Sequence, residues 1–253
     1  MLHRGRPLLG LLAVLVLGGC GARPSLLERA QAPHGLGELV GTPAAAAPAP
    51  EPPPPTYTVA RVLGSSIPVF ANPGDAAPAR TMSNPNEDGQ PRVFLVRSAQ
   101  PGWLEVLLPM RPNGSRGWIR EADVSLTQHQ WRILVELGAH RITVWNGAAI
   151  VVQEPVGIGT SDTPTPGGDY YITEMLRPPD PGGPYGPYAF GLSAYSEVLH
   201  SFAGGPGIVG LHGTNSPSGL GRDVSHGCIR MTNASIVKLA NSMPIGTPIS
   251  IVV

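Results

Sequence analysis

From Tyr57 to Val253 the chain is a succession of short apolar or alternating runs separated by turn-forming residues. The first runs are YTVARV, IPVF, RVFLV, WLEVLL and GWIR, and clusters such as ANPGD and RPNGS stand between them. Short runs bounded by Gly, Pro, Asn and Asp are typical of β-strands. Five such strands between residues 57 and 127 therefore predict a small β-barrel domain.

The same pattern continues over residues 131–253 and predicts a second β-rich domain. The runs WRILVEL, HRITVWN, AAIVVQEPVGIG, TPTPGGDYYITEML, FGLSAYSEVLHSF, IVGLHGT and PISIVV are expected to form strands and the turns between them. One segment, ASIVKLANSM at residues 234–243, has the pattern of a helix, with Thr232 or Asn233 as its cap. The fold class predicted from residue 57 onward is therefore mainly β, with one or two short helices.

The N-terminus has the composition of an export signal. Arg4 and Arg6 precede an apolar run at residues 7–19, which is shorter than the ~20 residues that a membrane-spanning helix needs. The run ends in Leu-Gly-Gly-Cys, which resembles a bacterial lipobox. This resemblance implies cleavage after residue 19 and a lipid on the sulfur of Cys20; the alternative is an ordinary secretory signal that holds Cys20 by chance.

Residues 20–56 are rich in proline and alanine and contain no aromatic side chain. Such a segment cannot bury a core, so we expect an extended tether between a lipid anchor and the folded domains. The protein is then exported to the cell envelope as a membrane-anchored lipoprotein that faces the cell wall. The 17 basic and 17 acidic residues cancel, so net charge predicts no nucleic-acid partner.

Cys228 is the second of only two cysteines, and it has no partner in the chain if Cys20 carries a lipid. The segment SHGC at residues 225–228 follows a loop that can bring the thiol beside His212. An imidazole can take the proton of a thiol, so we expect the pKa of Cys228 to lie below the usual ~8.5. Gly227 leaves backbone amides open toward a developing oxyanion, and Arg230 can hold a substrate carboxylate.

Two other interpretations of Cys228 stay open on these residues alone. A buried thiol also serves as a small apolar side chain in a core. His212, His226 and Cys228 are in addition possible zinc ligands, although a fourth ligand and paired cysteines are missing. We favour the nucleophile and expect no metal and no organic cofactor.

Two short segments together resemble the signature of L,D-transpeptidases: His212-Gly213-Thr214, and SHGCIR at residues 225–230. Twelve residues separate His212 from Ser225. The stretch TPTPGGDYY at residues 163–171 is similar to a second conserved segment of that family. The resemblance covers residues 131–253. A weaker resemblance, carried by PGWLEV and GWI, links residues 57–127 to bacterial SH3-like domains.

This resemblance implies a β-sandwich catalytic domain that transfers an acyl group within peptidoglycan. Cys228 is then the nucleophile, and His212 is the general base and acid, with its imidazole oriented by the carbonyl of Gly213. Gly227 and Ser225 are expected to shape the oxyanion site.

Substrate contacts are expected from His226 and Arg230 in the motif, and from Tyr188 in a tyrosine-rich insertion at residues 185–195. That insertion is expected either to cover the site as a lid or to be a packed loop.

The implied partners are peptidoglycan stem peptides, as donor and acceptor, and carbapenem-type β-lactams as covalent inhibitors. The implied product is a cross-link between the third residues of two stems. Two alternatives remain: an L,D-carboxypeptidase that hydrolyses the same bond, and a non-catalytic lipoprotein that binds the wall through the SH3-like domain.

Overall fold

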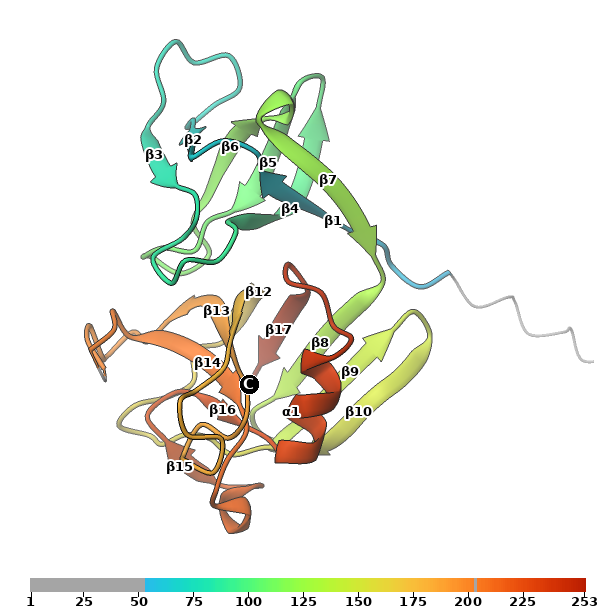
Figure 1. The fold of residues 1–253 in the computed structure, drawn as a ribbon, viewed down its shortest axis with the longest axis vertical. Coiled ribbons are helices and arrows are strands. Elements are labelled where there is room, and N and C mark those ends of the chain that lie inside the picture. Colours follow the sequence, from blue (N-terminus) through green and yellow to red (C-terminus); the bar gives the residue numbers. More distant parts are fainter. Residues whose placement is uncertain (1–52, 203) are drawn as a thin grey trace, which may run out of the picture. The chain divides into compact units, whose positions relative to one another are not determined.

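The computed structural model describes residues 53–202 and 204–253, and these are mainly β with a single α-helix (Figure 1). This confirms the predicted fold class. The expected signal peptide, the lipid on Cys20 and most of the tether lie outside the described residues. Among the described residues no helix has both the length and the apolar character required to cross a bilayer.

The N-terminal lobe, residues 57–129, contains a five-stranded antiparallel sheet in the order β6-β5-β4-β1-β7 and a separate β2-β3 hairpin. Phe94, Ile67 and Ile119 are fully buried in its core. Two of its strands, β3 and β7, were not predicted, because their side chains are mostly polar and exposed. The strands are β1 (Tyr57–Val62), β2 (Ser66–Val69), β3 (Arg80–Ser83), β4 (Val93–Gln100), β5 (Trp103–Leu107), β6 (Arg116–Arg120) and β7 (Val124–His129).

The C-terminal lobe, residues 131–253, is built on an eight-stranded sheet in the order β10-β9-β8-β17-β12-β13-β14-β16. The last strand of the chain lies between the first and the fifth strands of the lobe, parallel to β8 and antiparallel to β12 (Figure 1). The strands are β8 (Trp131–Glu136), β9 (Arg141–Asn146), β10 (Ala149–Pro155), β11 (Ile158–Gly159), β12 (Gly168–Leu176), β13 (Ala189–Tyr195), β14 (Ile208–His212), β15 (Asp223–Ser225), β16 (Ile229–Arg230) and β17 (Pro248–Val252).

The helix α1 (Asn233–Ala240) begins where the sequence predicts it. The Thr232 hydroxyl accepts a hydrogen bond from the Ser235 amide at 3.2 Å, which caps the first turn. Ile236 and Leu239 are fully buried and pack into the same core as the eight-stranded sheet. The helix is thus fixed beside the segment that carries Cys228.

The run FGLSAYSEVLHSF is not one strand, and the prediction of a strand through its second half is wrong. β13 ends at Tyr195, and the hydroxyl of Ser196 then accepts hydrogen bonds from the amides of Val198 and Leu199. These bonds fold the backbone into a turn, because they replace the partners that a neighbouring strand would supply. Val198 is consequently half exposed.

The two lobes share a third, smaller core, and the described residues 53–202 and 204–253 belong to one compact unit. Tyr171 of β12 is fully buried there against Val59, Leu95 and Leu107 of the N-terminal lobe. Its hydroxyl donates to the carbonyl oxygen of Val93 at 3.2 Å. The N-terminal lobe is therefore packed onto the sheet that carries the candidate site.

Candidate active site

Cys228 and His212 are brought together by a parallel strand pair. β14 and β16 pair with Leu211 opposite Ile229 and His212 opposite Arg230, so the residue before β16 lies beside the middle of β14. The amide of Gly210 donates to the Cys228 Sγ at 3.4 Å. A Cβ atom at Gly210 would lie 3.8 Å from both the Cys228 Sγ and the His212 Cδ2, so both side chains border the same point of β14.

The imidazole of His212 is buried and held by its neighbour in the chain. Its Nδ1 lies 2.6 Å from the carbonyl oxygen of Gly213, and a carbonyl can only accept. Nδ1 therefore carries the proton in the neutral ring, and Nε2 keeps its lone pair for a proton from another group. This is the orienting contact expected of Gly213.

Burial affects the two ionisable groups in opposite directions. It raises the pKa of the Cys228 thiol, and the Gly210 amide and the Arg230 charge offset only part of this effect. It lowers the pKa of His212 to about 4, against an upward contribution of the Gly213 carbonyl. The expected lowering of the Cys228 pKa is therefore wrong. At neutral pH the site holds a neutral thiol beside a neutral imidazole.

A tight loop sets the direction of the Cys228 side chain. The Ser225 hydroxyl donates to the Cys228 carbonyl at 2.6 Å and accepts from the Gly227 amide at 3.1 Å. Gly227 has a φ of 114°, a conformation that L side chains rarely adopt, and its carbonyl accepts from the Thr165 hydroxyl at 2.9 Å. Because the Gly227 amide is occupied in this way, Ser225 and Gly227 shape the loop, and that amide is not free for an oxyanion.

Two hollows meet at Cys228 and His212. One has a volume of about 260 Å³ and extends past β12 and β13 to Glu174, and the other has about 230 Å³ and extends to Arg230. Four side chains line both hollows: Tyr185, Phe202, His212 and Cys228.

The tyrosine that faces the site is Tyr185, whose ring centroid lies 4.9 Å from that of His212. Tyr188, the residue expected from the sequence, lines neither hollow; it packs against the lobe's core, beneath the guanidinium of Arg177 at 5.3 Å. The tyrosine-rich composition identified the insertion, but it did not distinguish among its tyrosines. Phe202 was missed as well, because its segment was expected to be a strand.

His226 and Arg230 both line the smaller hollow. His226 is exposed, and its ring lies 5.2 Å from that of Phe202. The Nε of Arg230 is buried and has no hydrogen-bond partner among the described residues. A buried guanidinium N–H without a partner is costly unless a ligand accepts from it.

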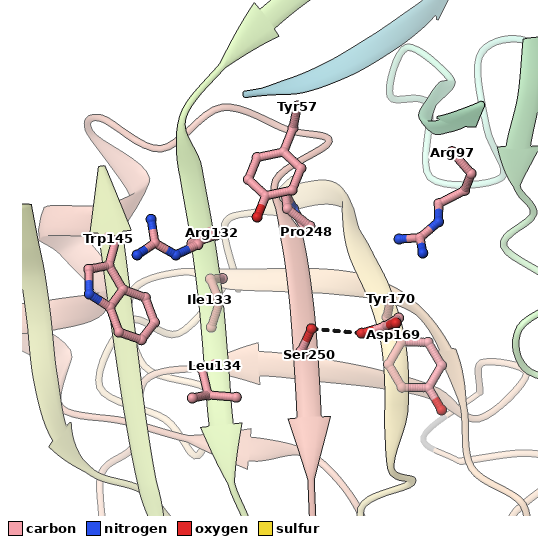
Figure 2. A pocket seen from close by; sticks show the side chains of 10 residues that line it. All are labelled: Tyr57, Arg97, Arg132, Ile133, Leu134, Trp145, Asp169, Tyr170, Pro248 and Ser250. Carbon is pink, nitrogen blue, oxygen red and sulfur yellow. Dashed lines mark hydrogen bonds between the residues drawn. The ribbon is translucent and has the colours of Figure 1, made fainter. Parts of the chain in front are cut away.

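A larger hollow, of about 400 Å³, lies away from these residues (Figure 2). Arg132, stacked on Trp145 at 4.5 Å, and Asp169, hydrogen-bonded to Ser250 at 2.7 Å, are among its lining residues. Its lining contains no cysteine and no histidine, so the candidate chemistry stays with Cys228. Across residues 53–202 and 204–253, no three His, Cys, Asp or Glu side chains are grouped as metal ligands would be.

Part of this chain is similar in sequence to proteins of a known family. Residues 130–251 match the family described as the L,D-transpeptidase catalytic domain. Proteins named L,D-transpeptidase YkuD from Bacillus licheniformis and Bacillus subtilis are 37% and 36% identical to this chain over 121 residues. Each match covers 48% of this chain and 65% of the relative, which is just under two thirds of the relative's length.

Among solved structures, an L,D-transpeptidase from Mycobacterium tuberculosis H37Rv aligns with a TM-score of 0.43 and 18% identity. The alignment covers 63% of this chain and 90% of that one. The family match, at residues 130–251, lies in the lobe that contains Cys228 and His212. Residues 130–251 of this chain are therefore similar in sequence to the L,D-transpeptidase catalytic domain.

Proposed function

We propose that the protein is a peptidoglycan L,D-transpeptidase that joins the third residues of two stem peptides through a thioester on Cys228. The observation that carries this proposal is the position of Cys228 and His212 where two hollows meet. Hydrolysis requires room for one peptide and a water molecule. Transfer requires room for two peptides, a donor and an acceptor, on either side of the thiol.

In the acylation step the Cys228 Sγ attacks the carbonyl carbon between the third and fourth residues of the donor. His212 Nε2 takes the thiol proton as the C–S bond forms, because neither group is ionised beforehand. The tetrahedral intermediate then loses the D-alanine amine, which receives that proton from His212. The products are a thioester on Cys228 and free D-alanine.

The second step uses the same two residues in reverse. The side-chain amine of an acceptor stem attacks the thioester carbonyl, and His212 takes a proton from the attacking nitrogen. The C–S bond breaks, and the proton returns to the sulfur. The thiol and the neutral imidazole are regenerated, and no metal or organic cofactor takes part.

Arg230 is the residue that we assign to a substrate carboxylate. Its buried Nε lacks a partner, and the hollow that it lines adjoins Cys228. The departing D-alanine ends in a carboxylate, and guanidinium–carboxylate hydrogen bonds are strong. For the oxyanion we assign the Cys228 amide, which donates to no group within the described part of the chain.

The proposed nucleophile also explains why carbapenems are expected to inhibit the protein, and the expected lipid anchor would place the protein near its substrate. A carbapenem presents a strained amide carbonyl to Cys228 and should leave one adduct per chain. A lipid on Cys20 and the tether that follows it would hold the domain near wall strands, where acceptor stems are abundant.

A carboxypeptidase and a non-catalytic wall-binding protein are distinguished from this proposal by one assay. The full chain is incubated with a tetrapeptide donor stem and increasing concentrations of an acceptor stem, and the products are identified by mass spectrometry. We expect third-to-third cross-linked dimers and free D-alanine, with none from Cys228→Ala. Tripeptide and D-alanine alone at every acceptor concentration would indicate a carboxypeptidase, and no product would indicate a binding protein.

A further inference from the structure

Arg111 of the N-terminal lobe donates hydrogen bonds to a loop that borders Cys228. We propose that Arg111 of this lobe is a positioning residue, which holds the loop that carries Phe202 in place beside Cys228. We call this segment the Phe202 loop; it comprises Ser196–Phe202 and Gly204–Gly207. The inference rests on the proposed function in so far as acylation of Cys228 is the reaction that the loop serves.

Arg111 bonds to both arms of the loop at its base. Its Nη2 donates to the carbonyl oxygens of Ser196 at 2.9 Å and Leu199 at 3.0 Å on the first arm. Its Nη1 donates to the carbonyl oxygen of Pro206 at 2.9 Å on the second arm. The planar guanidinium of arginine has N–H donors in fixed directions that can reach three such carbonyl oxygens at once. The ammonium group of a lysine lacks this fixed planar set of donors.

The start of the loop is anchored by the same region of the N-terminal lobe. Asn113 pairs with the backbone of Tyr195, accepting from its amide at 2.9 Å and donating to its carbonyl at 2.8 Å. The Tyr195 hydroxyl donates to the Pro109 carbonyl at 3.0 Å, and the Arg111 guanidinium lies 4.7 Å from the Tyr195 ring centroid. Contacts of this number and direction fix the position of the loop base relative to the N-terminal lobe.

Gly207 lets the two arms approach each other. Its φ is 78°, and a Cβ at this position would collide with the Leu199 carbonyl oxygen and lie 3.2 Å from the Arg111 Nη2. Any other residue at 207 would thus push the Leu199 carbonyl away from the guanidinium. The local backbone is therefore compatible with the three-carbonyl arrangement only because residue 207 is glycine.

The far end of the loop contacts the reaction site. Phe202 and Gly205 exchange two backbone hydrogen bonds, of 3.0 and 2.9 Å, which close the tip. The Phe202 side chain then lines both hollows together with Cys228. A displacement of the base would therefore move a wall that both substrates contact.

The test compares Arg111→Ala with Arg116→Ala in the full chain. Arg116 is an exposed arginine of the same lobe, its Nη1 lies 3.9 Å from the Glu105 carboxylate, and its side chain forms no hydrogen bond or ion pair with the described residues of the loop. We expect Arg111→Ala to lower the second-order rate of Cys228 acylation by a carbapenem roughly 3- to 30-fold. Arg116→Ala should leave it unchanged, and Arg111→Lys should restore little of the loss.

Two further readouts separate positioning from general damage to the fold. Hydrogen exchange should become faster in the Phe202 loop of Arg111→Ala, while the amides of β14 keep their protection. In a double-mutant cycle, Arg111→Ala should have little additional effect on acylation once Phe202 is alanine, because Arg111 acts through that side chain.

The inference is overturned if Arg111→Ala is acylated at the wild-type rate, or if its effect multiplies fully with that of Phe202→Ala. If the wild-type protein is not acylated at all, the proposed function itself fails. In that case faster exchange confined to the Phe202 loop would still support the role of Arg111, and unchanged exchange would refute it.

Discussion

The His212 Nδ1 lies 2.6 Å from the carbonyl oxygen of Gly213, and this contact leaves Nε2 as the basic nitrogen of the site. The ring is buried, and its pKa is about 4. Because the thiol pKa is raised as well, we expect proton transfer to His212 to accompany the attack of sulfur. The next two predictions depend directly on this arrangement.

Replacement of His212 by alanine should slow the acylation of Cys228 by a carbapenem but leave the alkylation of Cys228 by iodoacetamide unchanged. Acylation by a carbapenem should fall at least 10²-fold, because that step needs a base at the moment of attack. Alkylation by iodoacetamide depends on the thiolate fraction, and a neutral imidazole does not increase that fraction. In both the wild type and His212→Ala, the alkylation rate should therefore increase with pH, and the midpoint of this increase should lie above pH ~8.5. A midpoint below that value in the wild type, lost in the variant, would indicate a preformed ion pair instead.

The acid limb of the pH–rate profile should lie near pH 4. His212 must be neutral to accept the thiol proton, and burial holds its pKa at about 4. We expect kcat/KM to remain constant as the pH falls through 6.5 and to decline only near pH 4, with intrinsic fluorescence recorded at each pH as a control for unfolding. A half-maximal rate between pH 6 and 7 would contradict this assignment.

Ser225→Ala should weaken the loop that carries Cys228. The hydroxyl makes two hydrogen bonds in a buried site, and its loss leaves a carbonyl and an amide unpaired. We expect a decrease of about 1–3 kcal/mol in the free energy of unfolding, together with slower acylation. The control is Ser242→Ala, since that hydroxyl bonds the Lys238 carbonyl on the surface. Equal effects of the two substitutions would argue against a special role of Ser225.

Glu174→Gln should stabilise the protein at pH 8 but not at pH 5. Burial, reinforced by Asp88, raises the pKa of Glu174 from 4.5 to about 7, while a bond from Asn86 opposes the shift. Between these values the folded state holds a proton that the unfolded state has lost, so wild-type stability falls as the pH rises through this window. Glutamine is neutral throughout and can still accept from Asn86.

The expected gain in the free energy of unfolding for Glu174→Gln at pH 8 is about 1–3 kcal/mol, measured by urea denaturation at both pH values. Glu121→Gln, on the exposed surface, should show no such difference between pH 5 and pH 8. A gain of the same size at pH 5 would contradict the proposed cause.

Much of this arrangement follows from short segments of the sequence. The alternation of apolar residues predicts most strands, and the Thr232 cap predicts the start of α1. Cys228 and His212 were recognised because two short segments, at residues 212–214 and 225–230, resemble a family motif. Each segment is identified from a few neighbouring residues, and the structure then pairs the two in adjacent strands.

The remaining features depend on residues far apart in the chain. The apolar residues Val198, Leu199 and Phe202 have the composition of a strand, but the Ser196 turn and the carbonyl contacts of Arg111 fold them into a loop. The choice of Tyr185 over Tyr188 depends on the path of the insertion. The pKa of Cys228 depends on burial, which no motif reveals.

The most direct measurement of the central claim is the intact mass of the protein after rapid mixing with a tetrapeptide donor stem. We expect an adduct of the tripeptide acyl group on Cys228 and one equivalent of D-alanine. An acceptor stem added next should remove the adduct and yield a third-to-third dimer. The absence of any adduct, or an adduct that persists in Cys228→Ala, would contradict the thioester mechanism.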